Sequence, residues 1–178
     1  MKPYLLVLHN KLKFLFLSFK YKDLKVANIQ MFSRNLKISL SKGAKVNIGN
    51  HTVTDGRCVI VVGNSGELLI GNNCYFNESS MISVQSSVKI GNGVLFGPNV
   101  KIFDNNHIFD KQNGVKYNYN AAPVVIGDNT WLATNVVVLK GTTIGKNCVI
   151  GANCVVQGHI PDCSIVTNQT QLKIKTME

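Results

Sequence analysis

The sequence predicts an all-β fold, a parallel β-helix in which short strands coil around one axis. In the C-terminal half an aliphatic residue recurs every six positions without slippage, at Ile126, Leu132, Val138, Ile144, Ile150 and Val156. Neither the 3.6-residue period of a helix nor the two-residue period of an ordinary strand gives this spacing, whereas stacked strand-and-turn repeats do. The Val, Ile and Thr content of these units also favours strands.

Small and polar residues recur with the same period, at the places where a coil must turn. Gly127, Gly145 and Gly151 directly follow their aliphatic residues. Asn129 and Asn147 come two positions later in their units, as does Asn153 in the next. Because Gly and Asn tolerate positive φ, we expect them at sharp corners.

Three six-residue units per coil would stack each coil on the last. The expected pairs are Ile126 over Ile144, Leu132 over Ile150 and Val138 over Val156. Before residue 123 the aliphatic-Gly units recur less regularly, and their longer spacings indicate two- or four-residue insertions at corners. We therefore expect a β-helix over residues 36–166, after an N-terminal segment (1–35) and before a C-terminal tail (167–178).

The five cysteines predict no cross-linked framework. Their number is odd, and neither a CxxC motif nor a Cys/His ligand spacing is present, which argues against disulfides and a zinc site. Cys148 and Cys154 occupy the same place in successive units, where a small buried residue would pack at a corner. A reducing cytoplasm is the expected location.

Positive charge is concentrated at the N-terminus. Residues 1–45 hold ten Lys or Arg against Asp23 alone, a net +9 of the whole chain's +10. The rest of the chain is nearly neutral, and no nucleic-acid-binding motif accompanies the basic start, so we expect no nucleic-acid partner.

Residues 1–20 are basic and apolar, but charged and polar residues split the apolar run. They predict neither a signal peptide nor a membrane span. On a helical wheel one stripe gathers Leu5, Leu8, Leu12, Leu15, Phe16 and Phe19. Such a helix would pack on its own subunit or a neighbour, or it would lie on an anionic membrane surface. Leu6, Phe14 and Leu17 fall outside the stripe.

The stretch PVVIGDNTWLATNVVVLKGTTIGKNCVIGANCVV resembles a segment of bacterial sugar O-acetyltransferases of the galactoside and maltose type, in the hexapeptide-repeat acyltransferase family. Trp131 after IGDNT, the Tyr-Phe-Asn at 75–77 and a histidine after IGNGVLFGPNV extend the resemblance to about residues 68–161. The resemblance implies a left-handed β-helix with triangular coils, a homotrimer and acetyl-CoA as the donor. It implies no metal.

The repeat is interrupted at residues 103–122, which read as a loop extruded from the coil. Loops on a rigid scaffold often carry catalytic residues. His107 is the only histidine there, and the resemblance implies that it is the general base for a sugar hydroxyl. Asp104 would orient the imidazole or bind the sugar, or else form a turn. Asn77 and Tyr75 match acceptor positions of the family.

Trp131 matches a position near the acetyl-CoA cleft, and the backbones of Thr134 and Ala152 match positions that contact the pantetheine arm. The C-terminal tail departs from the family pattern that serves the nucleotide end of CoA. Lys140, Lys146, Lys173 or Lys175 would then supply charge for its phosphates.

These features predict a cytoplasmic acetyl-CoA-dependent O-acetyltransferase that acts on a sugar or glycan acceptor in surface polysaccharide biosynthesis, either capsule, exopolysaccharide or lipopolysaccharide. The basic N-terminal segment suggests peripheral association with the inner face of the membrane. Alternatives are N-acetyl transfer to an amino sugar, acetylation of a small molecule such as serine or a xenobiotic, and a non-catalytic trimeric β-helix that serves as an assembly or binding module.

Overall fold

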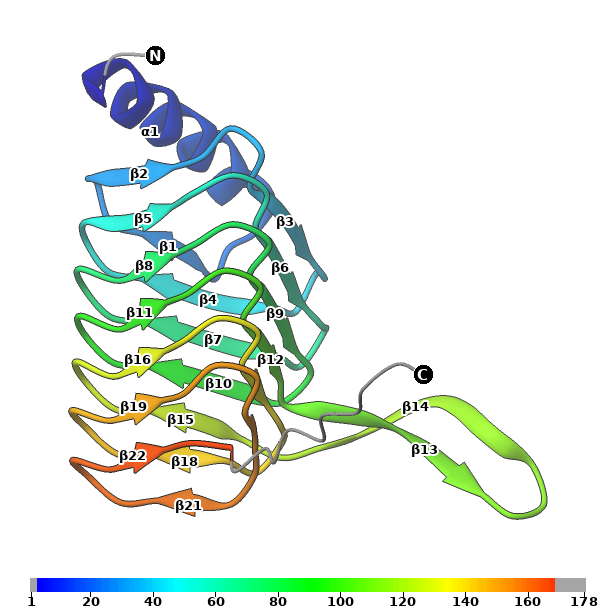
Figure 1. Ribbon diagram of the computed structural model, residues 1–178. Helices are drawn as coiled ribbons and strands as arrows, with labels where there is room; N and C mark the ends of the chain where they lie inside the picture. The colour runs from blue at the N-terminus through cyan, green and yellow to red at the C-terminus, as the bar shows by residue number, and fades with distance from the viewer. Residues whose placement is uncertain (1–2, 169–178) are drawn as a thin grey trace, which may run out of the picture.

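The computed structural model describes residues 3–168 and consists of one helix followed by a stack of short-stranded coils (Figure 1). The helix, α1, spans Pro3–Lys20. The strands form three parallel sheets, which are the three faces of a triangular coil. In Figure 1 the front strands run rightward and those behind them run leftward while the chain descends, so the coils wind left-handed, as the resemblance implies.

Each sheet takes one strand from each successive coil. The first sheet contains β1 (Leu24–Val26), β4 (Lys45–Ile48), β7 (Glu67–Ile70), β10 (Ser87–Ile90), β15 (Val124–Ile126), β18 (Thr143–Ile144) and β21 (His159–Ile160). The second sheet contains β2 (Gln30–Phe32), β5 (Thr52–Thr54), β8 (Tyr75–Phe76), β11 (Leu95–Phe96), β16 (Trp131–Leu132), β19 (Val149–Ile150) and β22 (Ile165–Val166). The third sheet contains β3 (Lys37–Leu40), β6 (Val59–Val62), β9 (Met81–Val84), β12 (Lys101–Phe103), β17 (Val137–Val138) and β20 (Val155–Val156).

The stacking predicted from the six-residue period is confirmed residue by residue. The ladders pair Ile126 with Ile144, Leu132 with Ile150, and Val138 with Val156. The upstream insertions are confirmed as well, since Ile48 pairs with Ile70 and Ile70 with Ile90, at spacings longer than three six-residue units.

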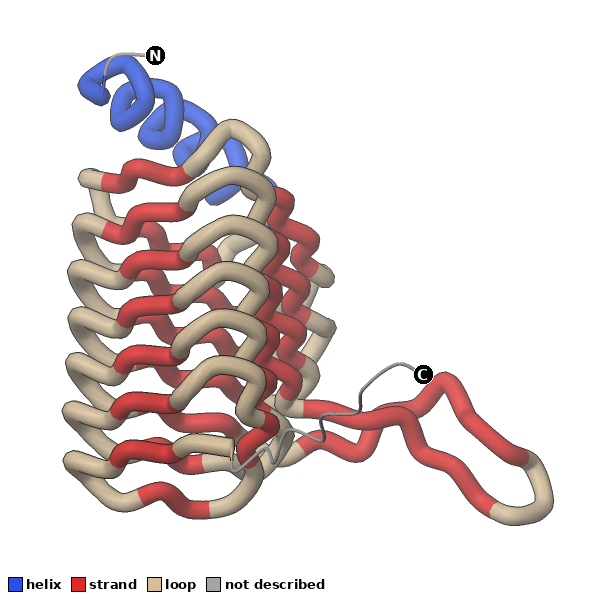
Figure 2. Tube along the Cα trace, in the orientation of Figure 1, coloured by secondary structure: helices blue, strands red, loops and turns tan. Residues whose placement is uncertain are grey.

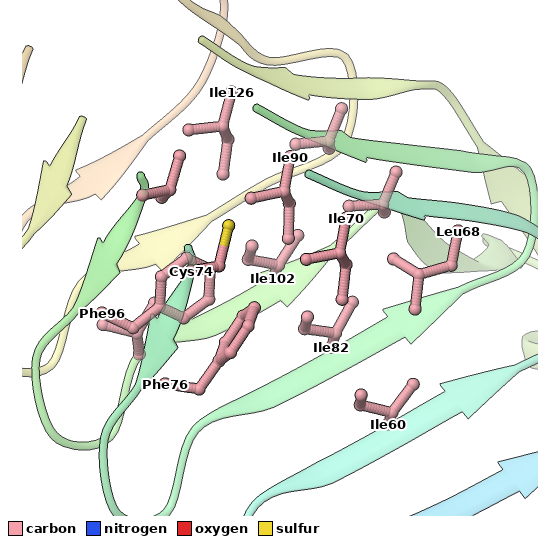
Figure 3. Packing of buried hydrophobic residues seen from close by; sticks show 14 of the residues in the cluster. Ile60, Leu68, Ile70, Cys74, Phe76, Ile82, Ile90, Phe96, Ile102 and Ile126 are labelled. Carbon is pink, nitrogen blue, oxygen red and sulfur yellow. The ribbon is translucent and has the colours of Figure 1, made fainter. Parts of the chain in front are cut away.

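The core is one continuous apolar column inside the coils. Strand residues alternate between interior and surface, so that each coil covers the inward residues of the previous one. Ile70, Ile90 and Ile126 line up in successive coils (Figure 3). Phe76 and Phe96 add an edge-to-face contact, with ring centroids 4.5 Å apart.

The corner asparagines adopt the expected conformation, whereas the corner glycines serve another purpose. Asn129, Asn147 and Asn153 have φ of 55°, 54° and 61°. Gly127 does not have positive φ; instead, a Cβ there would lie 2.6 Å from the carbonyl carbon of Gly145 in the next coil. At this corner glycine is therefore needed for the close approach of successive coils.

Cysteines fill the corners as predicted. Cys148 and Cys154 are almost fully buried, and so are Cys58 and Cys74. Burial raises the pKa of the Cys58 thiol to about 11. These thiols pack at the corners and donate to backbone oxygens there, and only Cys163 is exposed.

The coils begin at Leu24, earlier than the residue 36 expected from the sequence. The first coil carries Val26-Ala27 where later coils carry Ile-Gly, and α1 covers it (Figure 1). Phe14 of α1 is buried edge-on against Phe32, with centroids 5.3 Å apart. The Asn10 side chain donates to the backbone oxygens of Gln30 and Phe32 at 3.2 and 3.1 Å, so the helix closes the open edge of β2.

The interrupted segment forms an antiparallel hairpin that projects from the body between the third and first sheets (Figure 2). Its strands are β13 (Asn105–Asp110) and β14 (Gly114–Ala121). Within the described part of the chain no helix is long and apolar enough to cross a membrane.

Candidate active site

His107 lies on β13 and is held by the opposite strand of the hairpin. Its ring packs on Tyr119 with centroids 4.8 Å apart. Its Nδ1 lies 3.1 Å from the backbone oxygen of Lys116. Because a carbonyl oxygen only accepts, Nδ1 must donate, which leaves the lone pair on Nε2. The hairpin therefore presents His107 in the tautomer that a general base requires.

An open cavity of about 590 Å³ adjoins this imidazole. It lies where the hairpin leaves the coil, and Ser83 and Phe103 of the third sheet form its floor with the hairpin residues Phe109 and Tyr119 around His107. A mixture of aromatic and polar groups around a base suits a polar molecule with apolar faces, such as a sugar.

The structure does not place Asp104 where the sequence predicts. Its side chain is fully buried, and its carboxylate accepts from the backbone N–H groups of Gln85 and Ser86 at 2.8 and 2.7 Å and from the Asn105 side chain at 2.8 Å. Within residues 3–168 the structure records no hydrogen bond between this carboxylate and the His107 imidazole. Its backbone oxygen also accepts from Ala122, so Asp104 ties both ends of the hairpin to the preceding coil.

Further contacts order the hairpin along its length. Asp110 forms an ion pair with Lys116 at 2.6 Å and accepts from two backbone N–H groups of the turn. The bond from Lys116, followed by those from Asn113, lowers the Asp110 pKa to about 2. At the root, the Lys140 ammonium lies 3.3 Å from the Asn120 side-chain oxygen. Lys140, predicted as a phosphate contact, thus supports the hairpin in this structure.

The predicted acceptor residues lie together at the end of β8. The Tyr75 hydroxyl donates to the carboxylate of Asp55 in the previous coil, and this bond is the main reason that the pKa of Tyr75 is raised. Asn77 follows at the corner, where its side-chain oxygen accepts from the backbone N–H of Glu78. Sequence reasoning missed Asp55, although the coil length places it one coil before Asn77.

The predicted donor-site residues divide into two groups. Trp131 is half-exposed on the outer face of the second sheet, in one row with Tyr75 and Leu95. Thr134 and Ala152 are exposed at the corner that follows, and the backbone oxygen of Thr134 accepts from the residue after Ala152. Lys146 lies at a different corner, between the first and second sheets. Lys173 and Lys175 lie outside the described residues.

One chain therefore does not bring the predicted base and the predicted binding residues together. The hairpin leaves the corner between the third and first sheets, whereas the Tyr75 and Trp131 row lies on the second sheet (Figure 1). Among residues 3–168 no group of three or more His, Cys, Asp or Glu side chains is arranged to hold a metal ion.

Comparisons with known proteins agree with this architecture. Residues 123–158 match a family model described as bacterial transferase hexapeptide (six repeats). The galactoside O-acetyltransferase of Escherichia coli is 39% identical over 95 residues, which cover 52% of this chain and 45% of that protein. A putative lipopolysaccharide biosynthesis O-acetyl transferase of Escherichia coli is 29% identical over 151 residues, which cover 77% of each chain.

A solved structure supports the fold over nearly the whole chain. A single-site mutant of an N-acyltransferase from Bacillus cereus, in complex with dTDP-4-amino-4,6-dideoxyglucose and coenzyme A, superposes with a TM-score of 0.74 at 15% identity. The alignment covers 96% of this chain and 89% of that one. The chain spans about half the length of several of the curated relatives that it matches.

Proposed function

We propose that this chain is a hexapeptide-repeat transferase, and specifically an acetyl-CoA-dependent O-acetyltransferase that acts on a sugar hydroxyl. The observation that carries the proposal is the interruption of the repeat by a hairpin that presents His107 with a free Nε2 beside an open cavity. The named acetyltransferases among its relatives support the same chemistry.

The reaction is a direct transfer in a complex of both substrates. Nε2 of His107 takes the proton of the acceptor hydroxyl while the oxygen attacks the thioester carbonyl of acetyl-CoA. A backbone N–H stabilises the oxyanion that forms. The carbon–sulfur bond then breaks, the acetyl group stays on the sugar oxygen, and the imidazolium returns its proton to the CoA thiolate.

The other proposed site residues have different roles in the reaction. Asn77 and Tyr75 bind the acceptor, and Asp55 fixes the Tyr75 hydroxyl through their hydrogen bond. Asp104 acts as a positioning residue that anchors the hairpin, because its carboxylate already accepts from the partly buried backbone N–H groups of Gln85 and Ser86.

The donor lies along the corner after β16. Trp131 packs against the pantetheine arm, and the backbones of Thr134 and Ala152 hydrogen-bond to it. At this corner successive coils carry Gly97 and Ala133, which leave the edge free of large side chains. Lys146 would contact the phosphates of CoA only if the nucleotide end of CoA reached the corner between the first and second sheets.

The functional unit is a homotrimer, in which the hairpin of one copy completes the site of the next. A single chain keeps His107 on a different face from Tyr75 and Trp131, which supports a shared site. Exposed apolar residues support the contact on both sides, namely Phe109 and Val115 on the hairpin and Leu95 beside Trp131 on the second sheet. Residues 36–166 are the proposed transferase domain.

The acceptor is a sugar of a surface polysaccharide, and the enzyme works in the cytoplasm near the inner face of the membrane. The similarity to the putative lipopolysaccharide O-acetyl transferase over most of both chains supports this acceptor class. The net charge of +9 in residues 1–45 supports a location near anionic lipid.

The experiment is to measure CoA thiol release from acetyl-CoA with a panel of galactosides, amino sugars and surface polysaccharides. With a hydroxyl acceptor, His107→Ala should lower the rate by about 10²–10⁴-fold, the usual contribution of a general base. Lys111→Ala, an exposed hairpin residue outside the cavity, serves as the control.

Two results would overturn the proposal. A rate with amino sugars that largely survives His107→Ala would point to N-acetyl transfer, because an amine needs less help from a base. A chain that neither turns over nor binds acetyl-CoA would be a non-catalytic binding or assembly module.

A further inference from the structure

Helix α1 is apolar on two sides, and only one of them is used within the chain. Phe14 and Leu17 pack on the first coil together with the Asn10 side chain. The opposite side carries an outer stripe that consists of Leu5, Leu8, Leu12, Leu15, Phe16 and Phe19. These side chains are 43–80% exposed, with Phe19 the most exposed. The stripe predicted from the helical wheel is thus the face that this chain leaves uncovered.

The borders of the outer stripe are basic. On a helical wheel of 100° per residue, Lys11 lies next to one edge of the stripe, and Lys13 and Lys20 lie next to the other edge. No acidic residue occurs in α1. Lys20 extends over the Tyr21 ring, with its ammonium 5.3 Å from the ring centroid. An apolar stripe bordered by lysines is the pattern of an interfacial helix, whose ammonium groups reach the polar boundary of the membrane.

A groove of about 500 Å³ between α1 and the first coil continues this surface. Lys11 and Leu15 belong both to the groove and to the outer face, and Lys25 adds charge on the side of the coil. The apolar area and the positive charge are therefore contiguous at this end of the molecule.

We propose that the outer stripe of α1 docks the protein on the surface of an anionic lipid bilayer, with the helix lying in the plane of the interface. The positive charge of α1 favours a lipid bilayer over a second copy of the chain as the surface that covers the stripe. A second copy packed helix to helix on the stripe would bring two sets of lysines together without an acidic partner in either helix, whereas anionic headgroups complement them.

The position of α1 suits this role. The helix covers one end of the β-helix, whereas the hairpin with His107 projects from coils farther along the axis (Figure 1). Docking through α1 would hold the body upright on the bilayer and leave the hairpin free. If the proposed function holds, on which this consequence rests, docking would concentrate acceptors linked to membrane lipids near the site.

The test is co-sedimentation of the full chain with phosphatidylcholine vesicles that contain or lack phosphatidylglycerol. We expect binding to the anionic vesicles that weakens with added salt. Leu12→Ser with Phe16→Ser should weaken it by about tenfold or more, because the apolar anchor is lost. Lys11→Gln with Lys20→Gln should weaken it by about 25-fold, about fivefold for each lysine near the surface. Val155→Ser, an exposed aliphatic residue on the third sheet, is the matched control.

The outcomes are separable from the transferase proposal. Acetyl-CoA binding is measured on the same preparations and should be unchanged in both double variants, since none of the four residues lies near the donor corner. Equal binding to neutral and anionic vesicles, or no binding to either, would overturn the inference. So would self-association of the wild type that Leu12→Ser with Phe16→Ser abolishes, because the stripe would then be an interface between copies.

Discussion

Replacement of Asp104 by Asn tests whether this carboxylate anchors the hairpin or serves the imidazole. The exchange preserves shape but turns one acceptor oxygen into an NH2 group. In the native protein the two oxygens accept from the partly buried backbone N–H groups of Gln85 and Ser86, and the Asn105 side chain donates as well. In the variant one backbone N–H must therefore face another donor.

The cost follows from these contacts. An unsatisfied buried N–H costs about 1–3 kcal/mol, and the bonds that remain lose their charge assistance. We therefore expect Asp104→Asn to lower the free energy of unfolding by about 3 kcal/mol in total. For a chain of this size that corresponds to a Tm lower by about 6–12 °C.

The assay is thermal unfolding at fixed protein concentration, followed by the pH–rate profile of acetyl transfer. Asp162→Asn is the control, because Asp162 is exposed and accepts only one bond that the structure records, from the Lys146 backbone. We expect Asp104→Asn to lower Tm and to leave the acid limb of the profile in place. An unchanged Tm together with a shifted acid limb would refute the reasoning, since Asp104 would then act on His107 directly.

Two further predictions concern titratable groups. Because the Asp55 carboxylate accepts from Tyr75, the raised pKa means that this bond stabilises the protein below the ordinary phenol pKa and is lost as pH rises through the folded value. Asp55→Asn should therefore move one tyrosine to a lower titration pH in an ultraviolet difference titration; an identical titration in both proteins would contradict the contact. Ellman's reagent at about pH 8 should label one thiol per native chain rapidly, and Cys163→Ser should remove it, because the other four cysteines are buried. Rapid labelling of more than one thiol would show that the corners are not closed.

The coil architecture could be predicted from sequence because each unit has one obligatory inward position. Ile126, Leu132 and Val138 must all face the same interior, so their six-residue spacing specifies both the coil and its register. The hairpin could be located for the converse reason, since residues that leave the core lose the period. The same loss of period and the family resemblance single out His107 as the proposed base.

Other features depend on contacts that no local pattern reveals. The packed face of α1 was ambiguous because both sides are apolar, and burial of Asn10 against two backbone oxygens, not hydrophobicity alone, selects the face that packs. Asp104 appeared catalytic from its distance to His107 along the chain, yet two N–H groups of the previous coil hold it. Asp55 was not predicted as a site residue because its partner Tyr75 lies one coil away.

The most direct test of the central claim is calorimetric binding of acetyl-CoA, because donor binding requires no knowledge of the acceptor. The account predicts micromolar binding to the wild type that persists in His107→Ala and weakens by about tenfold in Trp131→Ala, the scale of one lost aromatic contact. Phe19→Ala, which removes an exposed aromatic residue from α1, should bind like the wild type. No binding at millimolar donor would contradict the claim that this β-helix is an acetyltransferase.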